Sequence, residues 1–163
     1  MTEYFPMKKI SWAALIAISG VLVIAQLVTI QPTNPAPKGD FPAPPQITAL
    51  LRRACYDCHS NETQWPWYTS IAPISWLVER DVERGRKELN FSEWESYYPA
   101  TRRRKLQWIE RTLRQEMMPP WTYRLLHPSA RLTEQELAAL GQWVETEMVS
   151  QTTTNSTNKE NSK

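Results

Sequence analysis

The chain has very few of the residues on which most metal sites and catalytic sites depend. Its 163 residues include only two cysteines and two histidines. Such numbers exclude a scaffold held by several disulfides, and they leave a conventional zinc site short of ligands. A charge excess is missing too, because basic and acidic side chains are equal in number within residues 46–150. We therefore expect no nucleic-acid partner.

Both cysteines and one histidine lie in a single motif, CYDCH, at residues 55–59. Three interpretations are open. A disulfide would close a small, redox-labile loop and leave the histidine without a role. A zinc ion would need a further ligand, and His127 is the one residue of that kind left. Covalent haem attachment fits the spacing best: Cys55 and Cys58 can form thioethers along one edge of the porphyrin, and His59 can be the proximal iron ligand. We expect one haem c per chain.

A long uncharged stretch occupies residues 10–30, with Lys8 and Lys9 just before it. As a helix it would be about 30 Å long, which is the thickness of the hydrocarbon core of a bilayer. Because basic residues prefer the cytoplasmic side, we expect residues 1–9 in the cytoplasm and the following domain in the periplasm. The prediction is a single-pass protein of the inner membrane. The alternative is a cleaved secretory signal, whose apolar region is usually shorter.

The remaining chain divides by composition. Residues 31–45 are rich in proline and predict an extended linker, because proline disfavours helices and central strands. Residues 46–149 are enough for one modest haem-binding domain and too few for two. Residues 150–163 are polar, lack apolar periodicity and predict a disordered tail.

No part of the domain shows the alternating pattern of a β-strand. Apolar residues at helical spacing instead predict helices, and a capping box predicts a short one that begins at Ser92. The ranges are 45–60, 74–89, 92–97, 100–116 and 131–148, the last with a capping box of Thr133 and Glu136. The expected fold is all-α, a small cytochrome c-like helical domain preceded by one transmembrane helix.

A haem iron held by one histidine has an open sixth position. Met118 is the first candidate for it, with Met117, His127 and an open or water-bound position as alternatives. Pro119 and Pro120 follow the methionines and force an extended run that could carry a sulfur across the distal face. The competing interpretation is that both methionines simply fill the core, as methionine usually does.

The predicted loop after the motif carries Trp65, Trp67 and Tyr68. These rings could cover a haem edge or donate a hydrogen bond to a propionate, and ordinary aromatic packing explains them equally well. No second group of acid and base residues is visible, with one spare histidine and no further cysteine. We therefore expect a protein that is not an enzyme.

Three segments occur in a characteristic order: CYDCHSNETQWPWY, then IAPISWLVERDVERGRKELNFSEW, then MPPWTYRLLHPSARLTEQELAALGQW. This order resembles the bacterial single-haem family known as the haem-binding domain, over about residues 41–145. The resemblance implies that Cys55 and Cys58 attach the haem and that His59 is its proximal ligand. It also places Met118 where related cytochromes c carry their distal methionine, and the neighbouring Met117 leaves that assignment open by one position.

The function expected from these features is that of a membrane-anchored periplasmic c-type cytochrome, which transfers single electrons between redox partners. Two alternatives remain, a haem-based sensor of gas or redox state and an accessory cytochrome subunit of a larger respiratory or photosynthetic complex. The expected partners are redox proteins or a membrane redox complex, and the bilayer itself through residues 10–30.

Overall fold

The computed structural model describes residues 11–28, 32–39 and 41–160, the last nine of them as backbone only. Helices account for all the regular structure within these ranges, so the predicted all-α class is confirmed there. The chain forms two compact units, one of residues 1–32 with 65–80 and one of residues 33–64 with 81–163. The predicted cytoplasmic segment 1–9 lies outside the described residues.

The first unit contains α1, Trp12–Ala25, whose side chains are apolar and mostly exposed all round the helix. Its fourteen residues span about 21 Å, less than a bilayer core requires. In the described part of the chain, no helix combines the length and the apolar character needed to cross a membrane. The predicted transmembrane helix over residues 10–30 and the single-pass inner-membrane location are therefore wrong.

The end of α1 has a specific cause in the first unit. Gln26 caps the helix, and its side chain forms a pair of hydrogen bonds with the backbone of Ala72. The Gln26 Nε2 group donates to the Ala72 carbonyl at 2.9 Å, and the Ala72 N–H donates to Gln26 Oε1 at 3.1 Å. Trp76 Nε1 also donates to the Val28 carbonyl at 3.1 Å. The chain turns here because residues remote in sequence bind its backbone and side chain, which hydropathy alone does not reveal.

The first unit also contains a 3₁₀-helix, Trp67–Ser70, inside the predicted loop. Helix α4, Ile74–Glu88, follows and confirms the prediction over 74–89. Its first part belongs to the first unit and its last part, from Asp81, belongs to the second.

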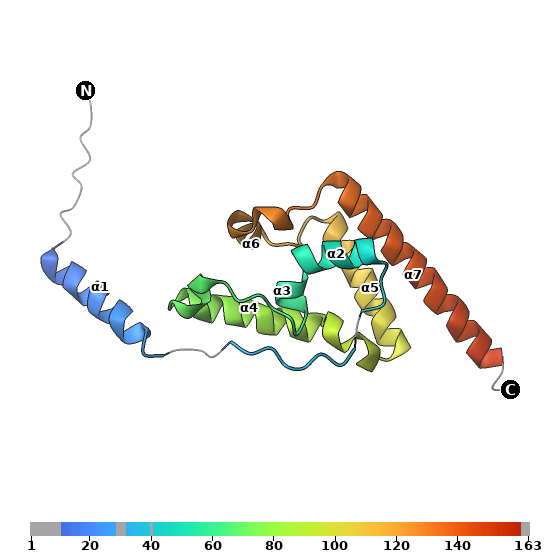
Figure 1. Cartoon of the computed structure of the whole chain (residues 1–163), viewed down its shortest axis with the longest axis horizontal. Helices are drawn as coiled ribbons and strands as arrows, with labels where there is room; N and C mark the ends of the chain where they lie inside the picture. The colour runs from blue at the N-terminus through green and yellow to red at the C-terminus, as the bar shows by residue number, and fades with distance from the viewer. Residues whose placement is uncertain (1–10, 29–31, 40, 161–163) are drawn as a thin grey trace, which may run out of the picture. The chain divides into compact units, whose positions relative to one another are not determined.

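The second unit holds the CYDCH motif. The helices α2 and α3 are Pro45–Ala54 and Tyr56–His59, and they replace the single predicted helix over 45–60. The later helices are α5, Pro99–Arg114, α6, Trp121–Leu126, and α7, Glu134–Glu160. Helix α5 packs along α7 (Figure 1). Helix α6 was not predicted, because it is only six residues long and follows two prolines.

Aromatic rings fill much of the core of the second unit. The Phe41 ring lies within 5.4 Å, centroid to centroid, of the rings of Phe91, Trp94 and Trp143. The leucines and the valine that are most completely buried with them come from α2, α5 and α7: Leu51, Leu106, Leu140 and Val144. This cluster explains part of the high tryptophan content by ordinary core packing.

Capping boxes were predicted at two helix starts, and the structure contains one of them. The box of Thr133 and Glu136 is present, with the Thr133 N–H donating to Glu136 Oε2 at 2.8 Å and the Glu136 N–H donating to Thr133 Oγ1 at 3.3 Å. The predicted box at Ser92 is absent. Instead Asn90 caps a 3₁₀-helix, Phe91–Ser96, by accepting a hydrogen bond from the Ser92 N–H.

The segments flanking the domain are more ordered than the sequence indicated. From residue 33 onward, the proline-rich segment bonds to the rest of the second unit, for example through the Lys38 N–H, which donates to the Ser92 carbonyl at 2.8 Å. Helix α7 continues to Glu160, through most of the predicted disordered tail. No glycine or proline follows Gly141 to end it.

Candidate haem site

The CYDCH motif forms one short helical turn. Cys55 ends α2 and begins α3 with φ −128° and ψ −33°, which bends the chain between the two helices. The backbone N–H groups of Cys58 and His59 both donate to the Cys55 carbonyl, at 3.2 and 2.9 Å. Residues three apart on such a turn lie on one side of it. The backbone therefore places the two thiols on the same side, as attachment to one edge of a porphyrin requires.

Both cysteines are free thiols with partly buried side chains. Burial, together with the neighbouring Cys58, raises the pKa of Cys55 to about 12. Burial and the nearby carboxylates of Asp57 and Asp81 raise the pKa of Cys58 to about 11, against a lowering effect of Arg86. Both groups are thus neutral thiols at physiological pH. Among the described residues, no three Cys, His, Asp or Glu side chains come together as a group that could hold a metal ion.

His59 is held in one orientation and one tautomer. Its side chain is buried, and its Nδ1 lies 2.9 Å from the Gly85 carbonyl oxygen and 3.1 Å from the Leu89 carbonyl oxygen. Carbonyl oxygens only accept hydrogen bonds, so Nδ1 must carry the proton and Nε2 keeps its lone pair. Burial also lowers the pKa of His59, which favours the neutral imidazole. This is the state in which histidine binds iron.

Helix α4 reaches the motif because it carries a glycine at the contact. A Cβ atom on Gly85 would lie well inside the van der Waals contact distance to the Cys58 carbonyl oxygen, and it would lie 3.0 Å from the Cys58 carbonyl carbon. Any other residue would push α4 away from the motif. The missing side chain therefore allows the Gly85 and Leu89 carbonyls to reach His59.

Arg86, the next residue on α4, ties the loop after the motif to the proline-rich segment. Its Nε donates to the Ser60 carbonyl at 2.8 Å and its Nη1 to the Thr33 carbonyl at 2.9 Å. Its Nη2 donates to Asn34 Oδ1 and Thr63 Oγ1, both at 2.9 Å. Sequence reasoning missed this residue, because its partners come from two remote segments and share no motif with it.

A buried polar network continues from α4 past the carbonyls that bind His59. Asn90 Nδ2 donates to Asn61 Oδ1 at 2.8 Å, and the Asn61 N–H donates to Ser92 Oγ at 3.0 Å. The Asn90 N–H donates to the Tyr97 hydroxyl oxygen at 3.0 Å. Because Asn90 follows Leu89 directly, the network fixes the backbone that holds the histidine. These residues were also missed, since isolated asparagines in a sequence usually indicate turns.

The segment 117–127, which carries all three candidate sixth ligands, begins at a well-defined helix end. Glu116 has φ 52°, and the N–H groups of Glu116 and Met117 donate to the carbonyls of Leu113 and Thr112 at 3.1 and 3.0 Å. This is the Schellman motif, which normally has glycine in the left-handed position. The Met117 side chain is 55% exposed, whereas Met118 is half-buried.

A side-chain hydrogen bond joins the segment 117–127 to the motif. The Tyr123 hydroxyl donates to Asp57 Oδ2 at 2.6 Å, and Asp57 Oδ1 accepts from the Gln64 N–H at 2.9 Å. The half-buried His127 ring stacks on Tyr123 at 4.1 Å, and its Nδ1 lies 3.2 Å from the Tyr123 carbonyl oxygen. The structure therefore brings Cys55, Cys58 and His59 together and anchors the candidate-bearing segment to them, while the choice of sixth ligand stays a prediction.

The aromatic residues predicted to surround a haem belong to the other compact unit. Trp67 is 78% exposed and packs edge to face against Tyr68 at 5.9 Å. Trp65 and Tyr68 are half-buried. Their role near a haem stays a prediction.

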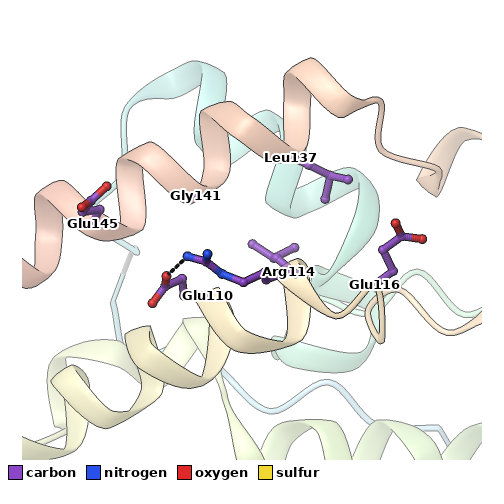
Figure 2. A pocket seen from close by; sticks show the side chains of 7 residues that line it. Glu110, Arg114, Glu116, Leu137, Gly141 and Glu145 are labelled. Carbon is purple, nitrogen blue, oxygen red and sulfur yellow. Dashed lines mark hydrogen bonds and ion pairs between the residues drawn. The ribbon is translucent and has the colours of Figure 1, made fainter.

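A separate pocket of about 300 Å³ lies between α5 and α7. Figure 2 shows that charged side chains dominate its lining, with Arg114 paired to Glu110 at 2.5 Å and Glu116 and Glu145 nearby. Neither a cysteine nor a histidine lines it. It therefore does not belong to the candidate haem site.

Comparison with known proteins places the chain among the haem proteins. The model of a family described as the haem-binding domain matches residues 20–146, most of the chain. This chain belongs to the haem-binding domain family. It is also similar to "Cytochrome c peroxidase Ccp" of Escherichia coli (strain K12), with 26% identity over 98 residues, 58% of this chain and 21% of that protein. The chain thus spans about a fifth of the length of this relative, and no solved structure matches it.

Proposed function

We propose that this chain is a monohaem c-type cytochrome that passes single electrons between redox proteins. The observation that carries the proposal is the state of His59, whose protonated Nδ1 donates to two backbone carbonyls and whose Nε2 keeps its lone pair. Cys55 and Cys58, on one turn with it, are the proposed thioether residues. The haem family match supports the cofactor, and the motif spacing supports its covalent attachment.

A bound haem would supply one-electron chemistry, with its iron alternating between the ferric and ferrous states. The residues of this chain tune that chemistry. Hydrogen bonds from Nδ1 to the Gly85 and Leu89 carbonyls orient the His59 ring and raise its basicity as a ligand. The buried network around Asn90 limits rearrangement of those carbonyls.

Met118 is the proposed sixth ligand, with Met117 and His127 as alternatives. Two features support Met118. Its side chain is half-buried while that of Met117 is largely exposed. Tyr123, five positions later, binds Asp57 of the motif. The stretch between Met118 and Tyr123 is therefore short, and its far end is held at the motif. A His/Met-ligated haem has no free position for exogenous ligands and a higher potential than a bis-histidine haem.

A second candidate function is a part in peroxide reduction. It rests on the similarity to the Escherichia coli cytochrome c peroxidase, which is itself an enzyme by name. The expectation that this chain is not an enzyme therefore stays a prediction. Peroxide-dependent oxidation of a reduced dye by the haem-loaded chain would favour this second candidate.

The first experiment is to produce the chain together with a haem c maturation system and to record spectra. Covalent haem is measured by the pyridine haemochrome of the denatured protein, and ligation by the oxidised, reduced and carbon-monoxide-treated spectra. Low-spin iron with a methionine–iron band and no carbon monoxide shift would support the closed electron carrier. Absence of covalent haem would overturn the proposal. A full carbon monoxide shift would reject it in favour of the gas-sensing alternative.

A further inference from the structure

The hydroxyl of Tyr123 makes a side-chain hydrogen bond between α6 and the turn that carries the haem motif. It donates to Asp57 Oδ2 at 2.6 Å, and the other oxygen of Asp57 is held by the Gln64 N–H at 2.9 Å. The distance is in the range of a charge-assisted O–H···O bond to a carboxylate, which is roughly twice as strong as a neutral one. Because both carboxylate oxygens are engaged, Asp57 presents a fixed acceptor to Tyr123.

The chain between the methionines and Tyr123 has little freedom. At its start, the Met117 N–H is bound to the Thr112 carbonyl at 3.0 Å. Pro119 and Pro120 then fix their φ angles, and α6 begins at the following residue, Trp121. Tyr123 closes the other end of this short stretch. The position of Met118 is therefore set by two anchors, the end of α5 and the bond to Asp57.

The same tyrosine organises the third candidate ligand. The Tyr123 carbonyl accepts from the His127 N–H at 2.9 Å, and the two rings stack at 4.1 Å with an interplanar angle of 16°. Stacking and backbone bonding do not need the hydroxyl. The hydroxyl makes the hydrogen bond to Asp57 of the motif, so removing it is a narrow change that leaves the ring in place.

We propose that Tyr123 is a positioning residue, which through Asp57 holds the segment 117–127 against the haem site and so keeps the sixth iron position closed. This inference rests on the proposed function. Tyr123 and Asp57 would not contact the iron themselves. Loss of their bond would let the segment open, so that the sixth ligand leaves the iron more often.

The test is Tyr123→Phe in the haem-loaded chain, with Tyr98→Phe as the matched control. Tyr98 is 81% exposed and precedes α5, so the control removes a hydroxyl far from this contact. Carbon monoxide binding to the reduced protein is followed by stopped flow, because its observed rate reports the open fraction. We expect the rate to rise about tenfold to a hundredfold in Tyr123→Phe, the range for loss of one charge-assisted hydrogen bond. Tyr98→Phe should match the parent protein.

Asp57→Asn provides a second test that does not depend on the folding of the first variant. It keeps the shape of the acceptor and removes its charge, so the carbon monoxide rate should rise by a smaller factor. Hydrogen exchange of the Arg124 and His127 amides, which bond to Pro120 and Tyr123, should be faster in both variants. A residue with only a structural role would lower the urea midpoint and leave the carbon monoxide rate unchanged.

The outcomes separate this inference from the function on which it rests. A parent protein without covalent haem would end the proposed function, and the inference with it. A parent with covalent, closed haem, whose carbon monoxide rate is unchanged in Tyr123→Phe and Asp57→Asn, would overturn the inference alone. A parent that binds carbon monoxide fully from the outset would also overturn it, since the sixth position would then not be closed.

Discussion

The two parts of the candidate haem site, the turn with His59 and the segment 117–127, are held by different kinds of contact. The backbone carbonyls of Gly85 in α4 and of Leu89, just after α4, hold the imidazole of His59, which is 7% exposed. The segment 117–127 meets the motif through a side-chain hydrogen bond, from Tyr123 to Asp57, and its Met117 is 55% exposed. The position of His59 is thus fixed by backbone groups beside a buried polar network, whereas the segment 117–127 depends on a side-chain contact.

This contrast predicts how the two parts respond to change. A backbone carbonyl cannot be removed by substitution, so the histidine side fails only when the motif itself or the packing of α4 is altered. The segment 117–127 depends on individual side chains and on a helix end, so single substitutions there should change ligation without unfolding the domain. Four variants test this contrast.

The largest effect should follow from Cys55→Ala with Cys58→Ala, which removes both thiols. We expect complete loss of covalent haem, because no other cysteine exists in the chain. Haem staining of denaturing gels measures it. Thr146→Ala, a change at an exposed position of α7, should keep full staining. Full staining in the double variant would refute attachment at the motif.

Gly85→Ala should disrupt the histidine side by displacing α4 from Cys58. Overpacking of this kind costs about 1–3 kcal/mol, and a helix gains up to about 1 kcal/mol when alanine replaces glycine. Gly141→Ala in α7 is the matched control, since nothing lies within 4 Å of its added Cβ, and it should raise stability by about 0.5–1 kcal/mol. Urea unfolding followed by circular dichroism measures both. Equal stabilisation in the two variants would show that α4 does not need the glycine.

Met118→Ala should open the sixth position while the domain stays folded. We expect loss of the methionine–iron band, carbon monoxide binding and a lower reduction potential, because the thioether ligand raises the potential. Met117→Ala is the neighbouring control and should leave the spectrum unchanged. If instead Met117→Ala or His127→Ala removes the band or opens the site, the sixth ligand is reassigned to that residue.

Glu116→Gly should have the smallest effect, and unlike Gly85→Ala it should stabilise the domain. A residue other than glycine in the left-handed region costs about 1–2 kcal/mol, and the substitution removes this cost. Part of the gain in stability is lost again, because glycine has more conformational entropy in the unfolded chain. We expect the free energy of unfolding to rise by about 0.5–1 kcal/mol, with the spectrum unchanged. Glu145→Gly, at an exposed position inside α7, should lower it by a similar amount. A fall in both variants would mean that Glu116 makes a contribution beyond its backbone angle.

Local sequence patterns predicted the helical class and several helices well. The stripes in α4, α5 and α7 and the capping box of Thr133 and Glu136 depend on neighbours within a few residues, and such signals are visible in a sequence. The bend at Cys55, the cap at Asn90, the short helix α6 and the extension of α7 were missed. Each is decided by short-range backbone geometry or packing that hydrophobic periodicity does not record.

The predicted membrane span shows the limit of hydropathy. The stretch over 10–30 is uncharged and mostly apolar, yet α1 ends at Ala25, where Gln26 bonds to the backbone of Ala72. A partner 46 positions away cannot be found from a window of about twenty residues. The error came from treating a local composition as a complete structural signal.

The sequence alone identified the candidate donor set, because the spacing of Cys55, Cys58 and His59 is a local property of one helical turn. It also determined which residues could compete for a sixth position. Only the tertiary structure decided the tautomer of His59, the need for glycine at position 85 and the anchoring of Tyr123 on Asp57. The physical reason is that each of these depends on polar or steric contacts between segments more than twenty residues apart, which no local pattern encodes.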